Sequence, residues 1–192
     1  MSHQLRIASL LALTVLFVGC RGSVPIKDSS GQDLMGKDAY TVHTMRPDRA
    51  RGRLYALNYL LADAPLPRCS KVQILKASAK AIVFKDVASG MEYQYLYHKA
   101  SGPSIAAAAE RAFSHTCDNS QYNKMSAKDR EGIKKGEPLV GMTKAGVLLA
   151  TGYPPISRTP STDANEWVYW RNRFNTILVK FNSKGVVSEI VD

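Results

Sequence analysis

The chain has 192 residues, of which 45% are hydrophobic, 22% charged and 8% aromatic, a composition that excludes disordered and collagen-like proteins. Lys and Arg number 26 against 16 Asp and Glu, and the net charge of +10 is expected to attract phosphates, anionic lipid headgroups or acidic proteins. No apolar run reaches the roughly 18 residues of a membrane span, which excludes a multi-pass membrane protein.

Residues 1–19 have the layout of a secretory signal peptide. One cation, Arg6, precedes the apolar stretch Ile7 to Val18, and the small residue Gly19 follows. As a helix this stretch covers about 18 Å, whereas the hydrocarbon core of a bilayer is about 30 Å thick. A permanent transmembrane helix is therefore not expected here.

The signal peptide ends in a cysteine. The run LFVGC at 16–20 resembles the bacterial lipobox, although Phe17 stands where the pattern prefers Leu. The resemblance implies that the Cys20 thiol receives a diacylglycerol and, because Arg21 is not Asp, that the protein is delivered to the outer membrane of a Gram-negative cell. The alternative is an ordinary cysteine beside a different cleavage point. Residues 20–38 are rich in Gly, Ser, Asp and Lys, which predicts a lipidated flexible tether.

Once Cys20 is assigned to lipid, two cysteines are left, Cys69 and Cys117. In an exported protein such a pair favours a disulfide. The alternative is two unpaired thiols that lie too far apart to join. No C-x-x-C motif occurs, so neither a redox-active dithiol nor a zinc knuckle is indicated.

Residues 39–120 are predicted to form a β-rich domain that ends in one helix. Short alternating runs about ten residues apart indicate an antiparallel meander, which we interpret as a small SH3-like barrel. Apolar residues at three- and four-residue steps predict a helix over 104–117, which would bring Cys117 back towards Cys69. The predicted strands cover 53–59, 72–75, 81–84 and 91–97.

Residues 126–192 predict a second domain with the order helix, helix, strand, strand, strand. A capping pattern at Ser126 begins the first helix, and Gly136 ends it. Thr143 caps the second helix, which ends at Gly152. The three strands are predicted over 167–170, 175–181 and 186–191, so the fold class is α+β.

The second domain resembles the SmpA/OmlA family, which includes the BamE-like outer-membrane lipoproteins. The resemblance covers about residues 130–192 and is carried by VGMTK at 140–144, Val147, GYP at 152–154, WVY at 167–169 and the strand pair around VKF at 179–181 and GVV at 185–187. It implies a BLIP-like two-layer ααβββ fold and a lipid-anchored place on the outer membrane facing the periplasm. The chain departs from small family members in having about 90 residues of predicted β structure before this domain.

The candidate partner-binding residues are those to which the predicted fold assigns no role in the core. Arg171, Arg173 and Phe174 fall at the predicted tip of a hairpin, and we group Tyr153 with them. Arg next to an exposed aromatic residue is enriched at interaction hot spots. The alternative is a solvated turn.

The sequence shows no catalytic constellation and predicts neither a cofactor nor a metal site. Residues 136–143 imitate the spacing of a phosphate-binding loop, but Met142 stands where the loop needs Lys. His43, His98 and His115 are far apart and lack the spacing of metal ligands. The basic residues are dispersed, which argues against nucleic acid as a partner.

The sequence thus predicts a non-enzymatic outer-membrane lipoprotein that acts as a scaffold or adaptor in outer-membrane protein assembly or envelope integrity. Its expected partners are the outer-membrane bilayer, held through the acyl anchor, and an envelope protein such as the barrel-assembly machinery. Anionic lipid is a further candidate. The alternatives are an inhibitor of a periplasmic hydrolase and a peptidoglycan-binding lipoprotein.

Overall fold

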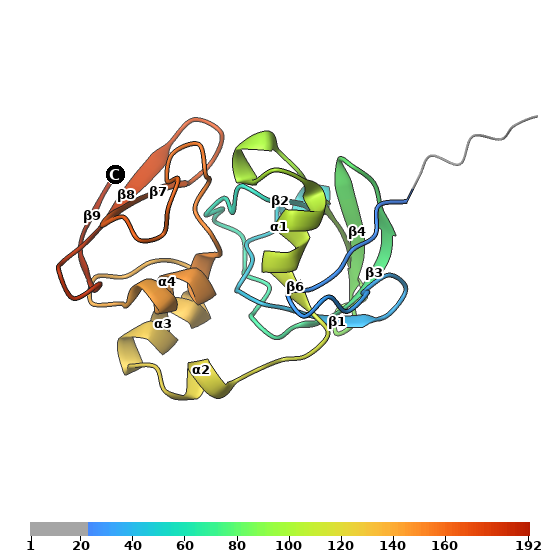
Figure 1. Ribbon diagram of the computed structural model, residues 1–192, viewed down its shortest axis with the longest axis horizontal. Helices are drawn as coiled ribbons and strands as arrows, with labels where there is room; N and C mark the ends of the chain where they lie inside the picture. The colour runs from blue at the N-terminus through green and yellow to red at the C-terminus, as the bar shows by residue number, and fades with distance from the viewer. Residues whose placement is uncertain (1–22) are drawn as a thin grey trace, which may run out of the picture.

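The computed structural model describes residues 23–192 and has the mixed α+β architecture that the sequence predicts. The predicted signal peptide and Cys20 lie outside the described residues. Two separate hydrophobic cores divide the described chain into a first unit, residues 23–117, and a second unit, residues 118–192. The two units lie side by side along the long axis of the molecule (Figure 1). Among the described residues, no helix combines the length and apolar character needed to cross a bilayer.

The first unit is built on a six-stranded sheet with the order β2-β5-β4-β3-β1-β6. Its central strands β3, β4 and β5 pair antiparallel and alternate buried with exposed residues, as the period-two pattern predicts. The elements of this unit are β1 (Asp38–Thr41), β2 (Arg53–Tyr55), β3 (Lys71–Ala77), β4 (Ala81–Asp86), β5 (Glu92–Leu96), α1 (Ile105–Ala112) and β6 (Phe113–Ser114).

The predicted antiparallel meander is wrong at the edges of this sheet. β2 is shorter than predicted and pairs in parallel with β5, with Leu54 opposite Tyr95. The other edge is formed by β1 and β6, which the sequence did not predict. Both edges join segments that are distant in the chain, so local alternation carries no information about them.

Helix α1 ends at Ala112, five residues before its predicted end. Phe113 adopts an extended conformation and pairs with Thr41 of β1. Its ring is fully buried and meets Phe84 and Tyr95 edge-on, with ring centroids 5.2 and 5.6 Å away. Burial of this aromatic ring in the sheet core therefore overrides continuation of the helix.

The predicted flexible tether is wrong for residues 23–38. Ile26 and Leu34 are fully buried in the first core, so this core begins well before residue 39. Asp28 is also buried, and its carboxylate accepts hydrogen bonds from Ser30 and is paired with His115. Burial alone would raise the pKa of Asp28, but these hydrogen bonds hold the pKa well below its usual range. Two isolated apolar side chains in a polar segment thus fix it to the sheet.

From residue 127 onward the second unit has the predicted order of two helices and three strands. Its sheet has the order β7-β8-β9, antiparallel throughout, and its core contains Trp167, Tyr169 and Val179 with no exposed surface. The sequence did not predict its short first helix, α2. The elements are α2 (Ser120–Asn123), α3 (Ala127–Lys135), α4 (Lys144–Thr151), β7 (Glu166–Trp170), β8 (Thr176–Phe181) and β9 (Val187–Val191).

Hydrogen bonds between backbones and buried side chains join the two units. The Thr44 N–H donates to the Leu149 carbonyl at 3.0 Å, and the Thr44 hydroxyl donates to the Ile133 carbonyl at 2.7 Å. The Asn58 amide donates to the Tyr153 carbonyl at 2.8 Å. The first unit thus caps the C-terminal ends of both α3 and α4, where carbonyl groups lack partners within the helix.

His43 is buried at this junction. An added Cβ at Gly152, where φ is +76°, would lie 2.7 Å from the His43 Nε2 atom, so only glycine allows α4 to end against the imidazole ring. His43 Nδ1 is buried and has no hydrogen-bond partner among the described residues. Burial lowers the pKa of His43 to about 4, and contacts with Asn58 and the Arg111 backbone offset only part of this effect.

This burial makes stability depend on pH. Between pH 6.5 and 4 the unfolded chain protonates His43 and the folded chain does not, so acid favours unfolding in this range. Lowering the pH from 7 to 4.5 is expected to reduce the free energy of unfolding by about 2 kcal/mol. Urea denaturation across this range measures the loss. The variant His43→Gln lacks the titrating imidazole and should show a much shallower profile, with only the small loss near pH 4.5 that carboxylates of lowered pKa such as Asp28 contribute. An equal slope in the variant would assign the effect to other groups.

Candidate functional site

The β7–β8 hairpin presents the most exposed large apolar side chain of the described residues, Phe174, which is 73% exposed. The Asn172 side chain accepts hydrogen bonds from the N–H groups of Phe174 and Asn175, at 2.8 and 3.1 Å. The Arg171 N–H closes the turn on the Asn175 carbonyl at 2.8 Å. The turn is therefore held by its own hydrogen bonds while Phe174 projects from it.

The same hairpin carries two arginines, of which Arg173 contacts the aromatic ring. The Arg173 guanidinium carbon lies 4.3 Å from the centre of the Phe174 ring, within the range of a cation–π contact. Arg171 forms an ion pair with Asp192, with its Nη2 and Nε atoms 2.5 and 3.0 Å from one carboxylate oxygen. The hairpin thus combines one exposed ring with two guanidinium groups, of which Arg171 is already partnered.

A groove of about 480 Å³ begins at the base of the hairpin and is lined by both units. The Leu60 N–H donates to the Trp170 carbonyl at 2.9 Å, which brings the first unit against the end of β7. Its apolar lining is formed mainly by Leu60, Leu139, Ile177 and Ile190, and its charged lining by Arg46, Glu137 and Arg171. A groove lined by both apolar and charged side chains can accept a protein segment.

Tyr153, the fourth predicted partner-binding residue, belongs to a different part of the surface. It is 37% exposed, and its ring lies 4.5 Å from the guanidinium carbon of Arg111 in the first unit. It lines a second groove, of about 250 Å³, with Leu148 and Leu149. The structure therefore brings Arg171, Arg173 and Phe174 together but places Tyr153 at the junction of the units.

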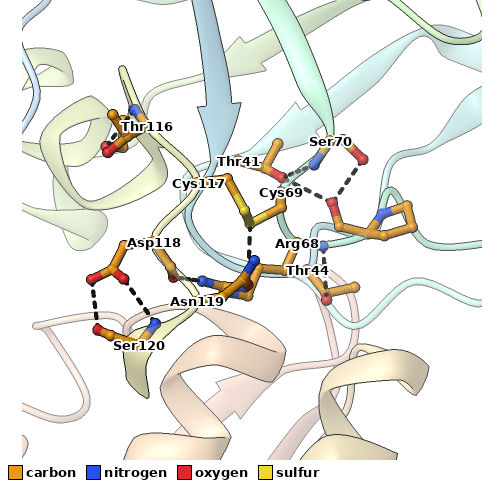
Figure 2. The surroundings of a disulfide bond; sticks show 12 residues. Thr41, Thr44, Arg68, Cys69, Ser70, Thr116, Cys117, Asp118, Asn119 and Ser120 are labelled. Atoms are coloured by element: carbon orange, nitrogen blue, oxygen red, sulfur yellow. Dashed lines mark hydrogen bonds between the residues drawn. A yellow bond between two sulfur atoms is a disulfide. The ribbon is translucent and has the colours of Figure 1, made fainter. Parts of the chain in front are cut away.

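The structure joins Cys69 and Cys117 in a disulfide with a Cα–Cα distance of 5.3 Å (Figure 2). Beside it, Arg68 donates hydrogen bonds to the Asp118 carbonyl and, at 2.6 Å, to the Asn119 side chain. These contacts hold the chain at the point where it leaves the first unit for the second. The disulfide thus fixes the start of the second unit to the first sheet.

The three histidines named above lie apart in the fold. His43 is buried at the junction, the His98 imidazole accepts a hydrogen bond from the Ala100 N–H at 3.1 Å, and His115 pairs with Asp28. Within residues 23–192, no group of three or more His, Cys, Asp or Glu side chains is placed to hold a metal ion.

Sequence reasoning found the hairpin but missed the groove. Leu60 and Leu61 precede a turn-rich segment. Two adjacent leucines are unusual next to a turn, and this was the one sequence signal for an apolar surface here. Ile190 lies in a predicted strand, but its position beside the first unit depends on how the two units pack. The groove is formed by the packing of the two units, which local sequence patterns do not predict.

No family model matches this chain, and no significant match was found among curated proteins or solved structures. The function must therefore be inferred from the residues and their geometry.

Proposed function

We propose that this protein is a lipid-anchored, non-enzymatic adaptor of the outer membrane that faces the periplasm and binds an envelope protein through the β7–β8 hairpin. The signal peptide and Cys20 support the anchor. The order of two helices and three antiparallel strands over 127–191 supports an SmpA/OmlA-like, BLIP-like second domain. The first unit is proposed to be an SH3-like domain on the basis of its central antiparallel strands.

The exposed ring of Phe174 is the observation that carries this proposal. The Phe174 side chain is 73% exposed, and it lies on a hairpin that also carries a guanidinium group and borders a groove. Aromatic and Arg residues supply most of the binding energy at the centre of many protein interfaces. The hydrogen bonds of the turn hold the backbone that carries the ring before a partner arrives, which lowers the entropy cost of binding.

Site-specific photo-crosslinking tests this proposal. A benzophenone amino acid in place of Phe174, in the full chain expressed in its own cell envelope, is expected to crosslink to an outer-membrane assembly protein. The matched control carries the same amino acid in place of Val87, which is 47% exposed on the first unit and lies away from the hairpin. This control is expected to give no such adduct, because exposure alone does not bring a partner within reach.

The replacement Phe174→Ala separates binding from folding. Because the ring is largely exposed, its loss should change the free energy of unfolding by less than about 0.5 kcal/mol. Co-purification of the partner should nevertheless fall at least about tenfold. Equal adducts from positions 174 and 87 would contradict a specific binding surface. An adduct with a periplasmic hydrolase would contradict the adaptor function and support an inhibitor.

A further inference from the structure

The described chain begins at one end of the first unit. The Val24 N–H donates to the carbonyl of Ala77, the last residue of β3, at 3.4 Å. Only four residue steps separate Cys20 from Val24, and a fully extended chain covers at most about 14 Å in that number. An acyl chain on Cys20 would therefore keep this end of the first unit close to the bilayer surface.

The same end of the sheet carries exposed lysines. Lys76 lies next to the last residue of β3, and Lys80 lies in the turn that leads to β4. The Tyr97 N–H donates to the Lys80 carbonyl at 2.9 Å, which brings Lys99 to this end. All three lysines are exposed, and none forms an ion pair with another described residue. We call Lys76, Lys80 and Lys99 the basic end.

The stretches that form the basic end contain no carboxylate. Residues 71–85 and 93–109 include neither Asp nor Glu, whereas the other end of these strands carries Asp86 and Glu92. In β3, β4 and β5 the carboxylates therefore lie at the other end, where Lys71 and Lys85 accompany them, and the end where the chain enters carries cations alone. Arg21, between Cys20 and the described chain, adds a further cation to the sequence next to this end.

The chain enters the first unit on the side away from the second unit. In Figure 1 the chain enters at one extreme of the long axis, and β7, β8 and β9 lie at the other. A bilayer at the entry end would therefore leave the Phe174 hairpin free to meet a partner in the periplasm.

We propose that the basic end binds the anionic phospholipid headgroups of the leaflet that holds the acyl chains of Cys20, and so orients the molecule with its second unit outward. This inference rests on the proposed lipid anchor. The anchor limits the distance to the surface to at most about 14 Å, which is less than two Debye lengths of about 8 Å at physiological salt, so attraction between lysine and lipid phosphate is only partly screened. The acyl chains supply the affinity, and the lysines supply the orientation.

Vesicle sedimentation tests the headgroup interaction without the anchor. A chain of residues 21–192 contains every described residue and lacks both the leader and the acylated cysteine. It is expected to bind vesicles that contain phosphatidylglycerol and not vesicles of phosphatidylcholine. Each lysine near an anionic surface strengthens binding about fivefold, so Lys76→Gln, Lys80→Gln and Lys99→Gln together should weaken it about 100-fold.

A matched triple variant controls for net charge. Lys124, Lys134 and Lys184 are exposed on the second unit, and their replacement by Gln removes the same charge from the far end of the molecule. This control should weaken binding less than about threefold. Equal losses in the two variants, or no binding by the unmodified chain, would overturn the proposal.

Inorganic phosphate separates a bilayer from an anion site. At equal ionic strength, phosphate should displace the chain from vesicles no better than chloride does, because the lysines bind a charged surface and not an individual ion. Stronger displacement by phosphate would contradict the membrane as the partner. Failure of this proposal would leave Cys20 acylation and the crosslink at position 174 unchanged, so the two proposals can fail separately.

Discussion

Replacing Cys69 and Cys117 with serine is expected to lower the free energy of unfolding by about 4 kcal/mol. The disulfide closes a loop with a sequence separation of 48, and the loss follows from the larger entropy of the open unfolded chain. The loop contains β3, β4, β5 and α1, so most of the first unit lies between the two cysteines. Urea denaturation of the chain of residues 21–192, under non-reducing conditions, measures the difference.

The same loop gives the disulfide a role at the junction of the units. Without it, the start of the second unit is held to the first sheet by non-covalent contacts, among them those of Arg68 with Asp118 and Asn119. The unmodified chain in reductant is the control and should match the double variant. A difference below about 1 kcal/mol would contradict this account of the disulfide.

Replacing Asp129 with alanine is expected to lower the free energy of unfolding by about 4 kcal/mol. One oxygen of this buried carboxylate accepts hydrogen bonds from the Ser126 hydroxyl and N–H, at 2.8 and 3.3 Å. The other accepts from the Thr143 N–H and hydroxyl, at 2.7 and 3.1 Å. Asp129 thus joins the N-terminal ends of α3 and α4, and its loss leaves buried donors without partners.

Close packing at Gly146 strengthens this expectation. An added Cβ there would lie 2.0 Å from a carboxylate oxygen of Asp129. Glycine at this position therefore leaves room for the carboxylate against the first turn of α4. The conservative variant Asp129→Asn should lower the free energy of unfolding by an intermediate amount, because the amide oxygen of Asn can still accept hydrogen bonds. Asp163→Ala removes an exposed carboxylate and should change stability by less than about 0.5 kcal/mol. Equal effects at positions 129 and 163 would contradict the assigned role.

The sequence predicted features that depend on residues close together in the chain. The capping box of Ser126 and Asp129 is confirmed, as is the end of α3 at Gly136, because both follow from hydrogen bonds within a few residues. The hairpin that carries Phe174 was located by the same local turn signals.

Apart from the short helix α2, the features that were missed depend on distant contacts. Ile26 and Leu34 fix the predicted tether to the first core, and Phe113 leaves its helix to pair with β1. The groove beside the hairpin requires Leu60 of one unit and Ile190 of the other. A second contact of Asp129, with Thr143, also joins two separate helices and was not visible in the capping pattern.

The proposal as a whole depends on lipid at Cys20, which the mass of the mature protein extracted from membranes tests directly. We expect a chain that begins at Cys20 and carries a diacylglyceryl group on the thiol and a fatty acyl group on the new N-terminus. An unmodified chain, whether it still carries residues 1–19 or begins at another residue, would contradict the anchor and the membrane orientation derived from it.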